Sequence, residues 1–184
     1  AERLISKYPG SSPDLVFQQG ALAFLKKDYS LAQKLFREAA RRASETTAEN
    51  ALFNENLAAL NANDASGAAA LIKEAAGSSR LRESILFEQA HYAAKRMAPQ
   101  AAELLANFIT LAETPTLKTQ ARLDQVEVAL NLNPPDLETV QAILPLLEKE
   151  QLSPEQTMQL ARLNILEAES RQTGVSGRKR RLVL

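Results

Sequence analysis

Apolar residues recur every three or four positions along most of the chain, with polar residues between them. The stretch LAQKLFREAA, from Leu31 to Ala40, is one example. This period of about 3.6 residues is that of an amphipathic α-helix. Pro, Gly, Asn and Asp interrupt the pattern at short intervals and predict turns. The sequence therefore predicts an all-α protein without a β-sheet.

The predicted helices come in consecutive pairs joined by short polar turns. The pairs are expected at 13–26 with 29–43, 47–62 with 65–76, 80–96 with 99–112, and 115–132 with 136–150. A leading helix is expected over 1–8 and a trailing helix over 154–172. Pro145 lies inside one of these helices and cannot donate a backbone hydrogen bond, so it predicts a bend or a break there.

The pairs repeat one another in sequence. Asp28 aligns with Asp64, 36 positions later, and the helices on both sides agree at this offset. The next copies follow after 34 and after 36 to 38 positions, with two residues added in the turn NLNPPD. The chain is thus predicted to be a single repeat array and a fragment of a longer one. Its units span about 12–46, 47–80, 81–114 and 115–152, with partial units at 1–11 and 153–184.

The first unit has a small residue midway along its first helix, an aromatic residue at the turn, and Ala, aromatic and Ala along its second helix. In order, these residues are Gly20, Tyr29, Ala32, Phe36 and Ala39. This pattern resembles the tetratricopeptide repeat (TPR) family, whose period is near 34 residues. The resemblance implies a right-handed α-solenoid of antiparallel helix pairs. Later units depart from the pattern, with Asn56 or Val126 in the place of the glycine.

Small residues and polar residues occupy equivalent places in successive units. Small residues that allow close helix approach are expected at Ala23, Ala59, Ala93 and Ala129 on the first helices, and at Ala32, Ala68 and Ala102 on the second helices. In the third second helix, Leu105 and Ile109 continue this register. A polar row consists of Gln19, Glu55, Gln89 and Gln125. Because apolar neighbours flank this row, we expect it to be at least partly buried and hydrogen-bonded; the alternative is a solvated stripe.

Composition and charge exclude several classes of partner. The 184 residues include 22 Lys+Arg and 22 Asp+Glu, so the formal net charge is zero. A phosphate-binding surface normally has a basic excess, so nucleic acid is not an expected partner. No apolar run approaches the roughly 20 residues that span a bilayer, so no direct membrane insertion is expected. The chain has no Cys, which excludes disulfides.

The chain carries little of the chemistry that catalysis requires. His91 is the single histidine, and no nucleotide-binding or zinc-protease motif is present. Nucleophilic sites usually need a histidine base, and zinc sites need about four ligands. We expect no catalytic residues, no metal and no cofactor. His91 is interpreted as a solvated or packing residue, or alternatively as a contact to a partner.

By the resemblance, the first helix of each unit lines a concave face that binds a peptide or protein. The partner-binding residues would be Phe17, Gln18, Ala21, Phe24, Phe53, Asn54, Leu57, Asn61, Phe87, Glu88, His91, Lys95, Asp124 and Glu127. The same register adds Leu25, Leu60, Ala94, Leu123, Leu130 and Asn131. Three phenylalanines and Leu123 form a row that either contacts the partner or packs between neighbouring helices.

The resemblance implies a non-catalytic interaction scaffold whose partner is another protein or peptide. The stretch from Ile5 to Phe36, with its YPGS turn, is also similar to bacterial envelope proteins of the same family. This points to envelope assembly in the periplasm or at the periplasmic face of the outer membrane. The alternative is a helical accessory domain of a larger envelope enzyme, such as a peptidoglycan lytic enzyme. Self-association through the end helices is a further expectation.

Overall fold

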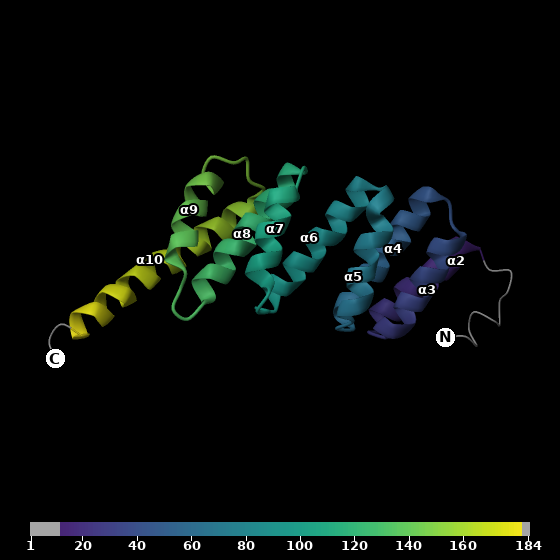
Figure 1. Cartoon of the computed structure of the whole chain (residues 1–184), viewed down its shortest axis with the longest axis horizontal. Helices are drawn as coiled ribbons and strands as arrows, with labels where there is room; N and C mark the ends of the chain where they lie inside the picture. The colour runs from purple at the N-terminus through teal and green to yellow at the C-terminus, as the bar shows by residue number, and fades with distance from the viewer. Residues whose placement is uncertain (1–11, 182–184) are drawn as a thin grey trace. The chain divides into compact units, whose positions relative to one another are not determined.

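The computed structural model describes residues 12–181, with side chains as far as Gln172. Every regular element in this range is a helix, which confirms the all-α prediction (Figure 1). The elements are α2 (Pro13–Leu25), α3 (Tyr29–Arg42), α4 (Glu45–Asn61), α5 (Ala65–Glu74), the 3-10 turn η1 (Ala75–Gly77), α6 (Ser79–Lys95), α7 (Ala101–Leu111), α8 (Pro115–Asn131), α9 (Leu137–Leu147) and α10 (Pro154–Arg181).

The helix boundaries agree closely with those expected from the sequence. The largest difference is at α10, which continues to Arg181 rather than ending near residue 172. The leading helix expected over 1–8 lies outside the described residues. Helix α9 runs through Pro145 without interruption, so the expected break is wrong, and the expected bend stays a prediction.

The turn inside each of the first three pairs has the same backbone structure. Lys27, Asn63 and Met97 take the left-handed conformation, with φ of 62°, 58° and 51°. The next amide after each of them donates back to an alanine carbonyl five residues earlier, as in the hydrogen bond from Asp28 N–H to Ala23 O. This is the Schellman arrangement, which satisfies carbonyls left open at a helix end. The three turns recur at the 36- and 34-residue spacing of the sequence repeat.

The fourth turn carries the two extra residues and is built differently. None of its residues takes the left-handed conformation, and the Asn133–Pro134 peptide is cis. Nevertheless, the amide of Asp136 donates to the carbonyl of Ala129 at 3.0 Å, as Asp28 does to Ala23 in the first turn. The insertion is therefore accommodated inside the turn, and the equivalent aspartate keeps its partner.

Aspartates start three of the four second helices. Asp28, Asp64 and Asp136 accept hydrogen bonds from the amides of Leu31, Gly67 and Thr139. An aspartate N-cap satisfies amides that the helix itself leaves open. The side-chain bond from Thr139 lowers the pKa of Asp136, and the amide of Gly67 lowers that of Asp64. Helix α7 has Gln100 at this position, without a side-chain cap bond.

The chain divides into two compact units, Ala1–Gln89 and Ala90–Leu184, with the boundary inside α6. Each is larger than a repeat unit of the sequence, and below they are called the first and the second unit. In the first unit, α3 packs against both α2 and α4 around Leu35 and Phe36. A Cβ atom added to Gly20 would lie 2.9 Å from two carbons of the Phe36 ring. The small residue predicted at this place is therefore favoured here by the aromatic ring of the facing helix. Helix α5, the turn η1 and helix α6 continue the unit with a buried cluster of Leu71, Ala75, Leu81 and Ile85.

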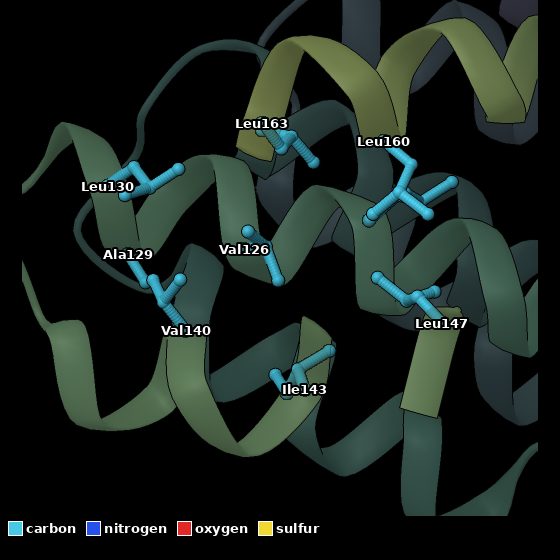
Figure 2. Close-up of a cluster of buried hydrophobic side chains, with 9 residues drawn as sticks. Val126, Ala129, Leu130, Val140, Ile143, Leu147, Leu160 and Leu163 are labelled. Atoms are coloured by element: carbon cyan, nitrogen blue, oxygen red, sulfur yellow. The ribbon is translucent and has the colours of Figure 1, made fainter. Parts of the chain in front are cut away.

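In the second unit, α8 contributes to a core shared with α9 and α10. Figure 2 shows Leu160 and Leu163 extending from α10, with Val140 and Ile143 on α9, around the buried residues of α8. Val126 is fully buried at the place of Gly20. The third pair corrects one predicted register. Ala101, Leu105 and Phe108 are buried in α7, whereas Ala102 is exposed and Ile109 only half-buried. The buried face of α7 therefore keeps the predicted Leu105 but has Ala101 and Phe108 in place of Ala102 and Ile109, and the helix starts two residues later than expected.

The other predicted small residues are buried as expected. Ala23, Ala59, Ala93 and Ala129 are at most 6% exposed, and Ala32 and Ala68 are at most 4% exposed. All four residues of the first group also accept the turn hydrogen bonds described above through their backbone carbonyls. Because their side chains are buried in packed interiors, a side chain larger than alanine would meet neighbouring atoms.

Candidate functional site

The second unit contains an open pocket of about 200 Å³ between α6, α8 and α10. Its lining combines two acidic and two basic side chains with one amide and two apolar residues. These residues are Ala94, Lys95, Met97, Asp124, Glu127, Asn131 and Arg162. Five of them, all except Met97 and Arg162, lie at positions that the repeat register assigns to the partner-binding face.

Asp124 is the most enclosed member of this group. It is 1% exposed, and its two carboxylate oxygens accept from different residues. The Nδ1 atom of His91 lies 2.5 Å from Oδ2, and Nε2 of Gln120 lies 3.1 Å from Oδ1. A carboxylate removed from water is costly unless such partners replace the lost hydration. His91 therefore joins α6 to α8, and the contact orients its imidazole ring.

Glu127 stands one turn further along α8 and is 23% exposed at its side chain. Lys95 Nζ and Gln159 Nε2 each lie 3.3 Å from its Oε2 atom, and an Arg162 nitrogen lies 3.9 Å from Oε1. The two cations extend much further into solvent, with exposed side-chain fractions of 50% for Lys95 and 71% for Arg162. The pocket thus presents exposed positive donors beside carboxylates that several partners hold in place.

This arrangement suits reversible binding of a polar segment. Long exposed cations contribute little to stability, so they exchange one partner for another at small cost. The pocket walls add carboxylate and amide acceptors, and Ala94 and Met97 supply apolar contact. A histidine bound to a carboxylate also supplies the base and the orienting acid of a nucleophilic triad. Among the described residues that line the pocket, none is a serine or threonine that could be the nucleophile.

The first unit contributes no residue to this pocket, and its predicted site residues divide into three groups. Gln18 is exposed, whereas Ala21, Leu57 and Glu88 are half-buried. Asn54 and Asn61 donate to carbonyls of their own helix, at Asn50 and Leu57. Phe24 makes an edge contact with Tyr29, with ring centroids 5.3 Å apart. Their contact with a partner stays a prediction.

The aromatic row favours the packing interpretation. Phe17 makes an edge contact with Phe36, and Phe53 packs against the buried cluster that contains Leu71 and Ile85. Phe87 is only 8% exposed, and Leu123 is fully buried. The first two members of the row are half-buried, and the last two are buried. These side chains therefore pack between helices, which leaves little of their surface for contact with a partner.

The polar row is at least partly buried, as predicted. Glu55 is 7% exposed, and Gln19, Gln89 and Gln125 are half-buried. Gln89 donates to Asn56 Oδ1 at 2.9 Å and to the carbonyl of Ala68 at 2.8 Å. It therefore ties α6 to both helices of the preceding pair within the first unit.

Glu55 also belongs to a second ion network, which we call the α3–α4–α5 network and which consists of Arg37, Glu55 and Glu74. The guanidinium of Arg37 lies 2.7 Å from Glu55 Oε1 and also contacts Glu74. Burial raises the pKa of Glu55 to about 6, against the opposing effect of Arg37. The other oxygen of Glu55 and the amide nitrogen of the fully buried Asn56 have no hydrogen-bond partner.

The sequence did not predict three residues in or beside the pocket, two of which lie beyond the four repeat units. Arg162 lines the pocket and Gln159 donates to Glu127, and both come from α10, which was expected only as a trailing helix. The signal was present, since Ser153-Pro154 marks a helix start like Ser12-Pro13. Met97 was missed because it lies in the turn after α6 rather than on the helix face.

Comparison of the chain with protein-family models, with curated proteins and with solved structures gave no match. Among residues 12–181, no helix combines the length and apolar character needed to cross a membrane. In the same part of the chain, no three side chains of the His, Cys, Asp and Glu types come together as a potential metal site.

Proposed function

We propose that this protein is a TPR-like interaction scaffold, with its helix pairs stacked as a right-handed α-solenoid. It acts without catalysis and binds an extended peptide segment of a partner protein along its first helices. The repeated Schellman turns support a common structure for the units, since the backbone repeats at the same spacing as the sequence. The envelope location remains part of the proposal, and its YPGS turn lies outside the described residues.

One observation supports placing the binding site in the pocket of the second unit. Five residues chosen only by repeat register line a single pocket in the second unit, on two helices that are distant in sequence. The pocket supplies donors, acceptors and a short apolar wall, which together match the groups of an extended peptide. Peptide sites commonly combine backbone hydrogen bonding with small pockets for individual side chains.

The experiment is selection of a displayed random peptide library against the immobilised chain. Affinities of the enriched peptides are then measured by fluorescence anisotropy. Lys95→Glu reverses the charge of a pocket donor that is half exposed, so it should leave the fold intact and weaken binding at least about tenfold. Lys149→Glu makes the same charge change at an exposed position that does not line the pocket, and should bind as the unaltered protein does.

Two outcomes would contradict the proposal. One is the absence of enriched peptides after repeated selection. The other is equal loss of binding in both variants, which would indicate a general electrostatic effect rather than this pocket.

A further inference from the structure

Helix α10 has two faces with different roles. Its inner face carries Leu160 and Leu163, which are buried in the core with α8 and α9. Its outer face is solvent-exposed, yet it carries two large apolar side chains. Met158 is 75% exposed and Ile165 is 62% exposed. Large apolar residues on an exposed helix face indicate an interaction surface when they form a continuous pattern.

The pattern on the outer face is that of a coiled-coil seam. Met158, Ile165 and Gln172 are seven residues apart and take heptad position a, and Ala161 and Ala168 take position d. All five are exposed. The side chains at e and g, which would flank such a seam, are also exposed. They are Thr157, Arg162, Asn164, Glu169 and Arg171. The core of this protein therefore uses only the b, c and f positions of α10 and leaves a complete seam uncovered over two heptads.

The charges beside this seam fit a second copy of the same helix in antiparallel orientation. In an antiparallel pair, e positions face e positions of the other helix. Arg162 of one copy then faces Glu169 of the other, and the two-fold axis creates this contact twice. The same register places Ile165 against Ala168, a large side chain against a small one. In a parallel pair, Arg162 would face Thr157 and Glu169 would face Asn164, so no opposite charges would meet.

We propose that the outer face of α10 is a self-association surface, on which two copies of the chain pair as an antiparallel two-helix coiled coil. The interface is isologous, because the same patch serves both copies. The present contact of Arg162 does not oppose this, since its 3.9 Å separation from Glu127 and its 71% side-chain exposure leave the guanidinium free to change partner. This inference does not depend on peptide binding at the pocket.

Sedimentation equilibrium of the 184-residue chain over a range of concentrations tests the proposal. We expect a monomer–dimer equilibrium that Ile165→Glu abolishes. Arg162→Glu and Glu169→Arg should each weaken dimerisation at least about tenfold, because two attractive contacts become two repulsive ones. The double variant Arg162→Glu with Glu169→Arg should restore it. Leu146→Glu is the matched control, since it places the same charge at a partly exposed leucine of α9.

Circular dichroism checks that every variant keeps the helical content of the unaltered chain. A protein that stays monomeric at all concentrations would overturn the proposal, as would a dimer unaffected by Ile165→Glu. Failure of the double variant to recover would show that Arg162 and Glu169 do not face each other. Ala161→Cys supplies the orientation test in a chain without cysteine. The two Ala161 positions meet across the seam of a parallel pair but lie far apart in the antiparallel register, so rapid disulfide formation would require the parallel arrangement.

Discussion

The two units each contain an ion network that joins helices. The two networks differ in how deeply their charged groups are buried and in how many partners each carboxylate has. The α3–α4–α5 network places Glu55 in the interior with one oxygen unbonded and Arg37 as its neutralising partner. The pocket network, formed by His91, Lys95, Asp124, Glu127 and Arg162, gives each carboxylate several donors and leaves its cations exposed. In the first arrangement, the buried charge of Glu55 depends on Arg37. The second tolerates exchange, which is what a binding site needs.

The largest effect should follow removal of the cation from the enclosed network. Arg37→Met keeps much of the side-chain volume but leaves Glu55 buried without its partner. Breaking a buried pair in this way costs about 3 kcal/mol. Urea unfolding at pH 8 should reveal this loss in the free energy of unfolding. At pH 5 the loss should be smaller, since Glu55 can then bind a proton. An equal loss at both pH values would argue against a role for the Glu55 charge.

The second effect is a pH dependence that belongs to Glu55. Burial raises its folded pKa to about 6, above the unfolded value of 4.5, while Arg37 and Arg41 oppose the shift and Glu74 adds to it. The folded state therefore holds a proton that the unfolded state releases, and the contribution of this group to stability decreases as pH rises from about 4.5 to 6. The difference is about 2 kcal/mol.

Glu55→Gln removes this titration and keeps an acceptor for Arg37. The variant should show a flatter dependence of the free energy of unfolding between pH 4.5 and pH 6. Glu148→Gln alters an exposed carboxylate of the second unit and serves as the control, with an unchanged profile. A profile of Glu55→Gln that parallels that of the unaltered chain would show that another group titrates in this window.

The periodicity of apolar residues made the helices predictable. The buried face of α7 and part of the pocket depended on how the helices pack. Gly20 and Phe36 could be placed from the sequence because the small residue and the aromatic ring are complementary. The buried face of α7 could not, because the turn before it lacks the aspartate cap that starts the other second helices. The pocket was half predictable. Repeat register supplied Lys95 and Glu127, whereas Arg162 depended on how α10 packs against α8.

The smallest effect should come from the pocket network. Its size tests whether this network contributes less to stability than the α3–α4–α5 network does. Lys95→Met removes a cation that is half exposed and keeps its aliphatic stem. Asp124 retains His91 and Gln120, and Glu127 retains Gln159 and Arg162, so no buried charge loses all its partners. Exposed ion pairs contribute about 0–1 kcal/mol, so the free energy of unfolding should change by less than about 1 kcal/mol. Measured by urea unfolding beside Arg37→Met, a loss of similar size in both variants would mean that Lys95 is a structural residue. A near-neutral result would leave it available to a ligand.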